Sequence, residues 1–362
     1  MTGGLTLSVY FGLRYLKAVT ITLLLCVGLI FAADTVELLR RASEKPDATT
    51  DVVMTIALFR LPSLAEQTVP FAILFGAMAA LLALSRKLEL VVARASGVSA
   101  WQFLLPAFVV TFLIGVLLVT AYNPMAAALR ERSDTLLAET IGGAQTAAST
   151  RGVWLRQDGE DGPSILRAGA FYGQGETVTD ATFFLYAPDQ TFRGRIDAER
   201  ATLEPGRWVV ENATIYGADG TRRSEARVEV ATRLNLVNAR EEFAAPDAVP
   251  FWALPGLIRA AADAGLPAHR YRLRFQTLLA RPLLLCAMVL IAATVSLRVF
   301  RMGGVVRLIV GGVIAGFVLY VATELAEDLG GAGFVGPIFA AWATPLMGLA
   351  FGATVLLHLE DG

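Results

Sequence analysis

The stretch RKLELVVARASGVS, residues 86–99, is a short charged segment between two long apolar runs. Placed on a helix at about 100° per residue, its apolar residues gather on one narrow stripe and its charged residues on the remaining arc. The stripe consists of Leu88, Val91, Val92 and Ala95. This pattern predicts a helix that lies at a membrane surface, joins two membrane spans and is accessible to a soluble partner.

The rest of the chain has the composition of a membrane protein. Hydrophobic residues make up 55% of the 362 residues and charged residues 17%, below the roughly 25% typical of soluble domains. Six apolar runs approach the ~20 residues that a bilayer core requires. They lie at about residues 14–33, 63–84, 102–122, 277–299, 304–323 and 335–357. The sequence therefore predicts two three-helix membrane blocks on either side of a more polar insert.

The insert has the pattern of an all-β domain. Short segments of alternating hydrophobicity are separated by turn pairs such as Asp-Gly and Pro-Gly. The predicted strands are 152–157, 164–171, 182–187, 194–203, 207–217 and 225–236. A sandwich or jelly roll is expected, followed by a helix within 249–265 that leads back to the membrane. The predicted domains are membrane block 1 over 1–130, the β domain over 131–250, and the connecting helix with membrane block 2 over 251–362.

Basic residues in short loops predict the orientation, because Lys and Arg mark the cytoplasmic side. The three basic groups are Arg14 with Lys17, then Arg86, Lys87 and Arg94, then Arg298, Arg301 and Arg307. With six spans, all three groups fall on one side, so both termini are cytoplasmic. The expected fold is an α-helical integral membrane protein with six transmembrane helices and an inserted all-β jelly-roll-like domain that faces the periplasm or exterior.

Several arginines lie on the outer side, against this tendency. They are Arg270, Arg272, Arg274 and Arg281 near the fourth span, Arg40 and Arg41 after the first, and Arg130 and Arg132 after the third. A transporter of a phosphate-bearing lipid would need such groups, because Arg pairs bidentately with phosphate. The alternative is that they are solvated flanking residues interleaved with acids such as Asp34 and Glu37.

The sequence offers no support for catalysis or for a metal centre. The phosphate-loop pattern GxxxxGK[ST] is absent, so transport driven by ATP would need a separate ATPase polypeptide. Cys26 and Cys286 lie inside predicted spans, and His269 and His358 are far apart. We therefore expect a non-enzymatic chain with no cofactor, no metal and no nucleic-acid partner.

Glu89 is the only acid in the charged arc of residues 86–99, beside Arg86, Lys87 and Arg94. Such a carboxylate can accept an arginine from a partner subunit. It can equally pair with a base in its own helix, an interaction worth only about 0.3–0.5 kcal/mol. The residues alone leave both interpretations open.

Four segments resemble the LptF/LptG lipopolysaccharide export permeases, and LptG more than LptF. They are DTVELLRR (34–41), LPSLAEQTVP (61–70), ELVVARASGVS (89–99) and AAWATP (340–345). ELVVARASGVS is the most specific, while the choice of LptG rests on ELVV and DTVELLRR. Because the six-span layout with a β insert also matches, the resemblance covers essentially the whole chain.

The resemblance implies a permease subunit of an ABC transporter that extracts lipopolysaccharide from the outer leaflet of the inner membrane. It implies an LptF-like permease as heterodimer partner, a dimeric LptB-like ATPase, and an LptC-like protein in a periplasmic bridge. Residues 86–99 would be the coupling helix, with Glu89 contacting the ATPase and the first and fifth spans acting as lateral gates. The lipid-contact and gate candidates are Asp34, Glu37, Arg40, Arg41, Arg130, Arg132, Tyr320 and Glu324; at Asp34 some family members carry a base instead.

The main alternative is a secondary transporter of an amphipathic or anionic substrate, driven by an ion gradient. Such proteins usually show internal repeats and ionisable groups near the membrane midplane. The two halves here share no obvious repeat, and Glu66 and Arg60 are the rare charges within the spans. A third interpretation, a β scaffold without transport, would not need the charged segment.

Overall fold

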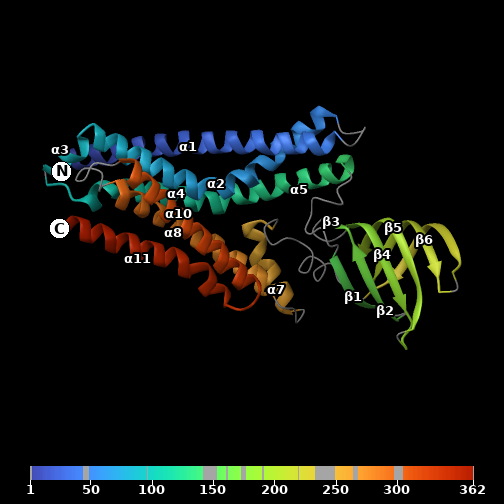
Figure 1. The fold of residues 1–362 in the computed structure, drawn as a ribbon. Helices are drawn as coiled ribbons and strands as arrows, with labels where there is room; N and C mark the ends of the chain where they lie inside the picture. The colour runs from blue at the N-terminus through green and yellow to red at the C-terminus, as the bar shows by residue number, and fades with distance from the viewer. Residues whose placement is uncertain are drawn as a thin grey trace.

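The structure is a computed structural model of the chain. It describes residues 2–43, 49–95, 97–141, 153–159, 162–172, 177–189, 191–218, 220–232, 249–263, 268–296 and 305–361. The chain forms a bundle of long helices and a β sheet. Both termini lie at one end of the bundle, and the sheet lies beyond the opposite end (Figure 1). The loop arginines Arg298 and Arg301 fall outside the described residues.

Six helical segments are long and apolar enough to cross a membrane, which confirms the six predicted spans. The first two spans lie in α1 (Thr2–Ala42) and α2 (Thr50–Arg86), and the last three lie in α8 (His269–Ser296), α10 (Val305–Gly331) and α11 (Pro337–Asp361). The third runs without a break through α4 (Ala100–Leu117), the π-helical turn η1 (Leu118–Tyr122) and α5 (Asn123–Ile141). The first three candidate spans have 36, 37 and 38 residues, well beyond the ~20 that cross a bilayer core. These helices therefore continue past the membrane toward the sheet.

The two membrane blocks pack around α2 and α8. Leu74 of α2 and Met288 of α8 are fully buried in the same apolar cluster. Small residues allow the outer helices to approach this centre, as is usual where membrane helices cross. A Cβ at Gly76 would lie 2.6 Å from the Cα of Val19, and a Cβ at Gly115 would lie 2.6 Å from the Cα of Pro282. Close packing thus joins α1 to α2 and α4 to α8.

The insert is one antiparallel sheet, which confirms the predicted all-β domain. Its strands are β1 (Val153–Gly159), β2 (Gly162–Ala168), β3 (Ala170–Tyr172), β4 (Thr177–Tyr186), β5 (Phe192–Glu204), β6 (Arg207–Gly217) and β7 (Arg222–Ala231). Strand order follows the chain, except that β3 pairs with β4 after the interruption at Gly169. Trp208 and Phe183 are fully buried at its core. The predicted strand ends at 152 and 233–236 lie outside the described residues.

The alternation of buried and exposed residues along β6 is imperfect, because Trp208, Val209 and Val210 are buried in succession and a second irregularity lies at Asn212. Val210 and Ala213 are both buried although three residues apart, and Asn212 between them has φ +53°. Pairing with β7 keeps one register on both sides, Val210 with Val228 and Ala213 with Glu225. Asn tolerates the left-handed conformation better than most residues. This conformation at Asn212 places Val210 and Ala213 on the same, buried face of the sheet.

Candidate functional site

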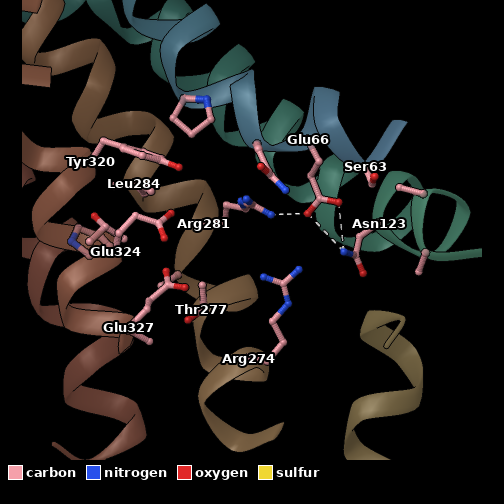
Figure 2. Close-up of a pocket in the computed structure, with 18 of the residues that line it drawn as sticks. Ser63, Glu66, Asn123, Arg274, Thr277, Arg281, Leu284, Tyr320, Glu324 and Glu327 are labelled. Carbon is pink, nitrogen blue, oxygen red and sulfur yellow. Dashed lines mark hydrogen bonds and ion pairs between the residues drawn. The ribbon is translucent and has the colours of Figure 1, made fainter. Parts of the chain in front are cut away.

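A cavity of about 230 Å³ lies among α2, α5, α8, α10 and α11. Its charged lining residues are Glu66, Arg130, Arg274, Arg281, Glu324 and Glu327. Figure 2 shows Arg281 reaching across to Glu66, with Arg274 beside it and the two glutamates of α10 on the other side of the cavity. Three arginines and three glutamates give this lining a formal charge of zero.

An ion pair between Glu66 and Arg281 joins the two membrane blocks at this cavity (Figure 2). Their side chains are 8% and 15% exposed, respectively. The Asn123 side-chain amide lies 3.3 Å from both carboxylate oxygens of Glu66 and donates to them. A buried charge is tolerated when it is paired and hydrogen-bonded. Arg281, one of the outer arginines of the sequence, thus has a partner within the fold.

The return segment from the sheet is fastened at the same place. It begins with the 3₁₀ turn η4 (Phe251–Ala253) and continues as α7 (Leu254–Asp263), the helix predicted within 249–265. The backbone N–H of Phe251 donates to Asn123 Oδ1 at 3.0 Å, and Trp252 Nε1 donates to the Thr120 carbonyl at 2.8 Å. Thr120 belongs to η1, and π-helical turns often occur at functional sites. The sheet connection and the interblock ion pair therefore share Asn123.

The acids predicted after the first span bind arginines. Arg40 donates to both oxygens of Glu37 at 2.9 Å, and Arg41 donates to one of them at 2.8 Å. Asp34 lies 3.5 Å from Arg60 of α2. One carboxylate therefore accepts hydrogen bonds from two guanidinium groups. Arg40 is the more accessible, with 73% of its side chain exposed.

The other lipid candidates divide between the cavity and the surface. Arg130, Tyr320 and Glu324 line the cavity, whereas Arg132 is exposed and outside its lining. Arg130 lies 3.9 Å from Asp134. Glu66, Asn123 and Glu327 also line the cavity and were not among the lipid-contact candidates, while Arg274 and Arg281 were noted in the sequence only as outer arginines. Glu66 carried a usable signal, because an acid inside an apolar span needs a partner.

The charged segment 86–99 forms a shorter helix than its pattern predicts. The last residue of α2 is Arg86, α3 covers Glu89–Ala95, and Ser99 caps α4. Leu88 adopts φ +60° in the turn between α2 and α3, so the two helices do not form one continuous helix. Leu90 is buried, while Leu88 and Val92 of the predicted stripe are 56% and 66% exposed. The stripe is therefore not the packed face of this helix.

Glu89 contacts α1 in this structure. Tyr10 donates its hydroxyl to Glu89 Oε2 at 3.0 Å, and Arg14 Nη1 lies 3.3 Å from Glu89 Oε1. These contacts differ from a pair with a neighbouring base of the same helix. Arg86 and Lys87 are exposed, and the side chain of Arg94 lies outside the described residues.

Residues 331–336, GAGFVG, match the bare pattern GxGxxG found in dinucleotide-binding loops. That fingerprint requires a preceding strand and a following helix within a βαβ unit. Here the segment connects α10 to α11, two membrane helices. The segment is therefore a turn between two spans, in which Gly333 has φ +82°.

A protein-family comparison matches nearly the entire chain. The family model described as "Lipopolysaccharide export system permease LptF/LptG" matches residues 9–358. No curated protein matches significantly. The matched range contains the β sheet, the cavity and α3.

Proposed function

The chain belongs to the LptF/LptG family of lipopolysaccharide export permeases, and we propose that it acts as an LptG-type membrane subunit of an ATP-driven transporter. The observation that carries this proposal is α3, which lies at the end of the bundle farthest from the sheet and carries Glu89 with a side chain that is 27% exposed (Figure 1). A separate LptB-like ATPase dimer would dock there, because the chain has no phosphate-loop motif of its own. In this arrangement α3 and both termini face the cytoplasm and the sheet faces the periplasm.

The physics of lipid extraction supports an external energy source. Burying an acyl chain contributes ~0.8 kcal/mol per CH₂, so a lipid with several chains cannot leave a bilayer by thermal motion alone. In the proposed cycle, lipopolysaccharide enters beside α1 and α10, is moved by ATP-driven rearrangement, and passes by way of the β domain to an LptC-like bridge. The transporter does the work, and the lipid itself is not chemically changed.

Apolar side chains are exposed on the proposed gate helices, as a contact with lipid or with a second permease subunit requires. Leu25 and Leu29 of α1 are 70% and 73% exposed, and Phe317 and Val318 of α10 are 56% and 59% exposed. Such surfaces suit lipid tails or an LptF-like partner helix. An ion-coupled transporter is less well supported, because Glu66 is bound by Arg281 and Asn123.

Changing Glu89→Arg tests the docking role. We expect ATPase association to weaken by about 100-fold, because a like charge replaces the carboxylate that would meet a basic residue of the partner. Copurification of the ATPase with the tagged permease measures this. Glu131→Arg, the same reversal at an exposed position of α5, should retain the ATPase. Normal copurification with Glu89→Arg, in a permease that is still inserted, would contradict the docking role.

Reversing both charges at the end of α1 tests lipid contact there. In the Arg40→Glu, Arg41→Glu variant, we expect photocrosslinking of lipopolysaccharide from a probe at Val36 to fall by about tenfold, because lipid phosphates lose their charged donors. Val36 is 67% exposed on the same helix. The matched control reverses Arg222 and Arg223, an adjacent arginine pair in the sheet. Equal crosslinking in both variants would remove Arg40 and Arg41 from the lipid path.

A further inference from the structure

The first turns of α1 hold the start of α3 through polar contacts. Glu89 Oε2 accepts from Tyr10 at 3.0 Å, and Glu89 Oε1 lies 3.3 Å from Arg14 Nη1. Residues four apart in a helix share one face, so Tyr10 and Arg14 present their side chains together. The Arg14 guanidinium also lies over the Tyr10 ring, 5.0 Å from its centroid. The three side chains form one cluster between two helices that are distant in sequence.

A buried apolar cluster beside these side chains includes residues of the same two helices. Phe11 of α1 and Leu90 of α3 are buried in one apolar cluster, at 5% and 3% exposure. Phe11 also packs edge-on against Phe103 of α4, with ring centroids 6.4 Å apart. At the start of α3, Glu89 therefore binds α1 through polar contacts, and Leu90 is buried in the apolar cluster to which Phe11 of α1 belongs.

The position of α3 depends on such contacts. A helix of seven residues is too short to be stable by itself in water, so packing against its neighbours determines where it lies. Its connection to α2 is a two-residue turn in which Leu88 has φ +60°. By contrast, α1 is a continuous helix of 41 residues whose far end carries Asp34, Arg40 and Arg41. A displacement of its beginning can be carried along this rigid element toward the opposite end of the bundle.

We propose that Tyr10 and Arg14 are positioning residues that fasten α3 to α1, so that a partner pressing on α3 moves the beginning of α1 with it. This inference rests on the proposed docking of an ATPase at α3. Glu89 can serve both contacts, because an ionised carboxylate offers about four acceptor sites and its side chain is 27% exposed. A basic group of the partner would approach the lone pairs that α1 leaves open.

The functional test uses the assembled transporter in lipid vesicles. The Tyr10→Phe, Arg14→Gln variant should still bind the ATPase, because Glu89 is intact and Leu90 remains buried in its apolar cluster. Lipopolysaccharide release per ATP hydrolysed should fall by about tenfold, within the range usual for coupling between sites. The matched control is Lys17→Gln, which removes an exposed base from the same part of α1 and should leave release unchanged.

A distance measurement tests the fastening without relying on transport. Spin labels at Leu13→Cys and Val92→Cys would report on α1 and α3, since both positions are more than half exposed. The native cysteines, Cys26 and Cys286, would first be replaced by alanine. In the wild-type background the label separation should remain the same with and without ATP, because the helices move together. In the Tyr10→Phe, Arg14→Gln background it should change when ATP is added.

The outcomes separate this inference from the docking role of Glu89. If Glu89→Arg loses the ATPase but Tyr10→Phe, Arg14→Gln exports normally and keeps the label separation constant, the fastening is overturned and docking stands. Loss of ATPase binding by the double variant would also overturn it, because Tyr10 and Arg14 would then act through docking. Retained ATPase binding by Glu89→Arg contradicts the docking role itself.

Discussion

Replacing Arg281 with alanine is expected to destabilise the folded bundle by about 3–5 kcal/mol, the usual cost of removing one partner of a buried ion pair. Glu66 would remain with a side chain that is 8% exposed, held only by the neutral amide of Asn123 among the partners described. The loss should appear as a lower midpoint in thermal unfolding of the detergent-solubilised protein. Labelling of Cys286, which is buried, should become faster as the bundle opens.

The control for this experiment is another arginine of the same cavity. Arg130 has a partner 3.9 Å away and a side chain that is 32% exposed, so Arg130→Ala should cost less than about 1 kcal/mol. Removing both charges, with Glu66→Leu and Arg281→Leu, should recover most of the stability lost by Arg281→Ala. If Arg281→Ala and Arg130→Ala unfold alike, the ion pair does not stabilise the contact between the two membrane blocks.

The same ion pair links the membrane part to the sheet. Asn123 donates to Glu66 and accepts from the backbone of Phe251, at the start of the segment that returns from the sheet. A displacement of that segment would alter the hydrogen bonds of Asn123 and so the surroundings of the ion pair. The interblock contact and the sheet connection are therefore coupled by one side chain.

Periodicity predicted the six spans and the β character of the insert, because hydropathy marks the residues that must leave water, but it merged β2 and β3 into one strand at 164–171 and began β4 at residue 182 instead of Thr177. It predicted the strand at 207–217 to the residue, since its turns and its buried positions are local features. It placed the first span at 14–33, whereas α1 covers Thr2–Ala42. Hydropathy marks only the part of a helix that lies in the hydrocarbon core of the membrane. Beyond it, Leu38 and Ala42 are buried in a cluster with residues of α2, so helix packing continues outside the membrane.

The site was less predictable because its contacts join distant residues. Glu66 and Arg281 are separated by 215 positions, and no local pattern specifies which base an acid will meet. For Glu89, the residues suggested a partner subunit or a base of its own helix, and the structure adds Arg14 of α1. The sequence also showed no sign of the turn at Leu88, because leucine rarely adopts a left-handed conformation.

In the β domain, replacing Trp208 with alanine is expected to cost about 3–5 kcal/mol, the usual penalty for emptying a large core site. Trp208 is fully buried and packs near Phe183, with ring centroids 6.1 Å apart. Its Nε1 donates to Gln157 Oε1 at 3.0 Å, so the variant also loses a hydrogen bond between β6 and β1. Because small single domains usually unfold cooperatively, the sheet should become sensitive to protease as a unit.

The helical bundle should survive this change, since its apolar clusters contain no residue of the sheet. Trp208→Ala should therefore still copurify the ATPase while lipopolysaccharide release stops, if the sheet receives the lipid as proposed. Trp154→Ala is the matched control, because Trp154 is 58% exposed and stacks on Phe184 at the surface. Normal release by a Trp208→Ala protein whose sheet is cleaved would exclude the β domain from the path. Release that fails only together with ATPase binding would instead show that the two parts of the chain fold as one unit.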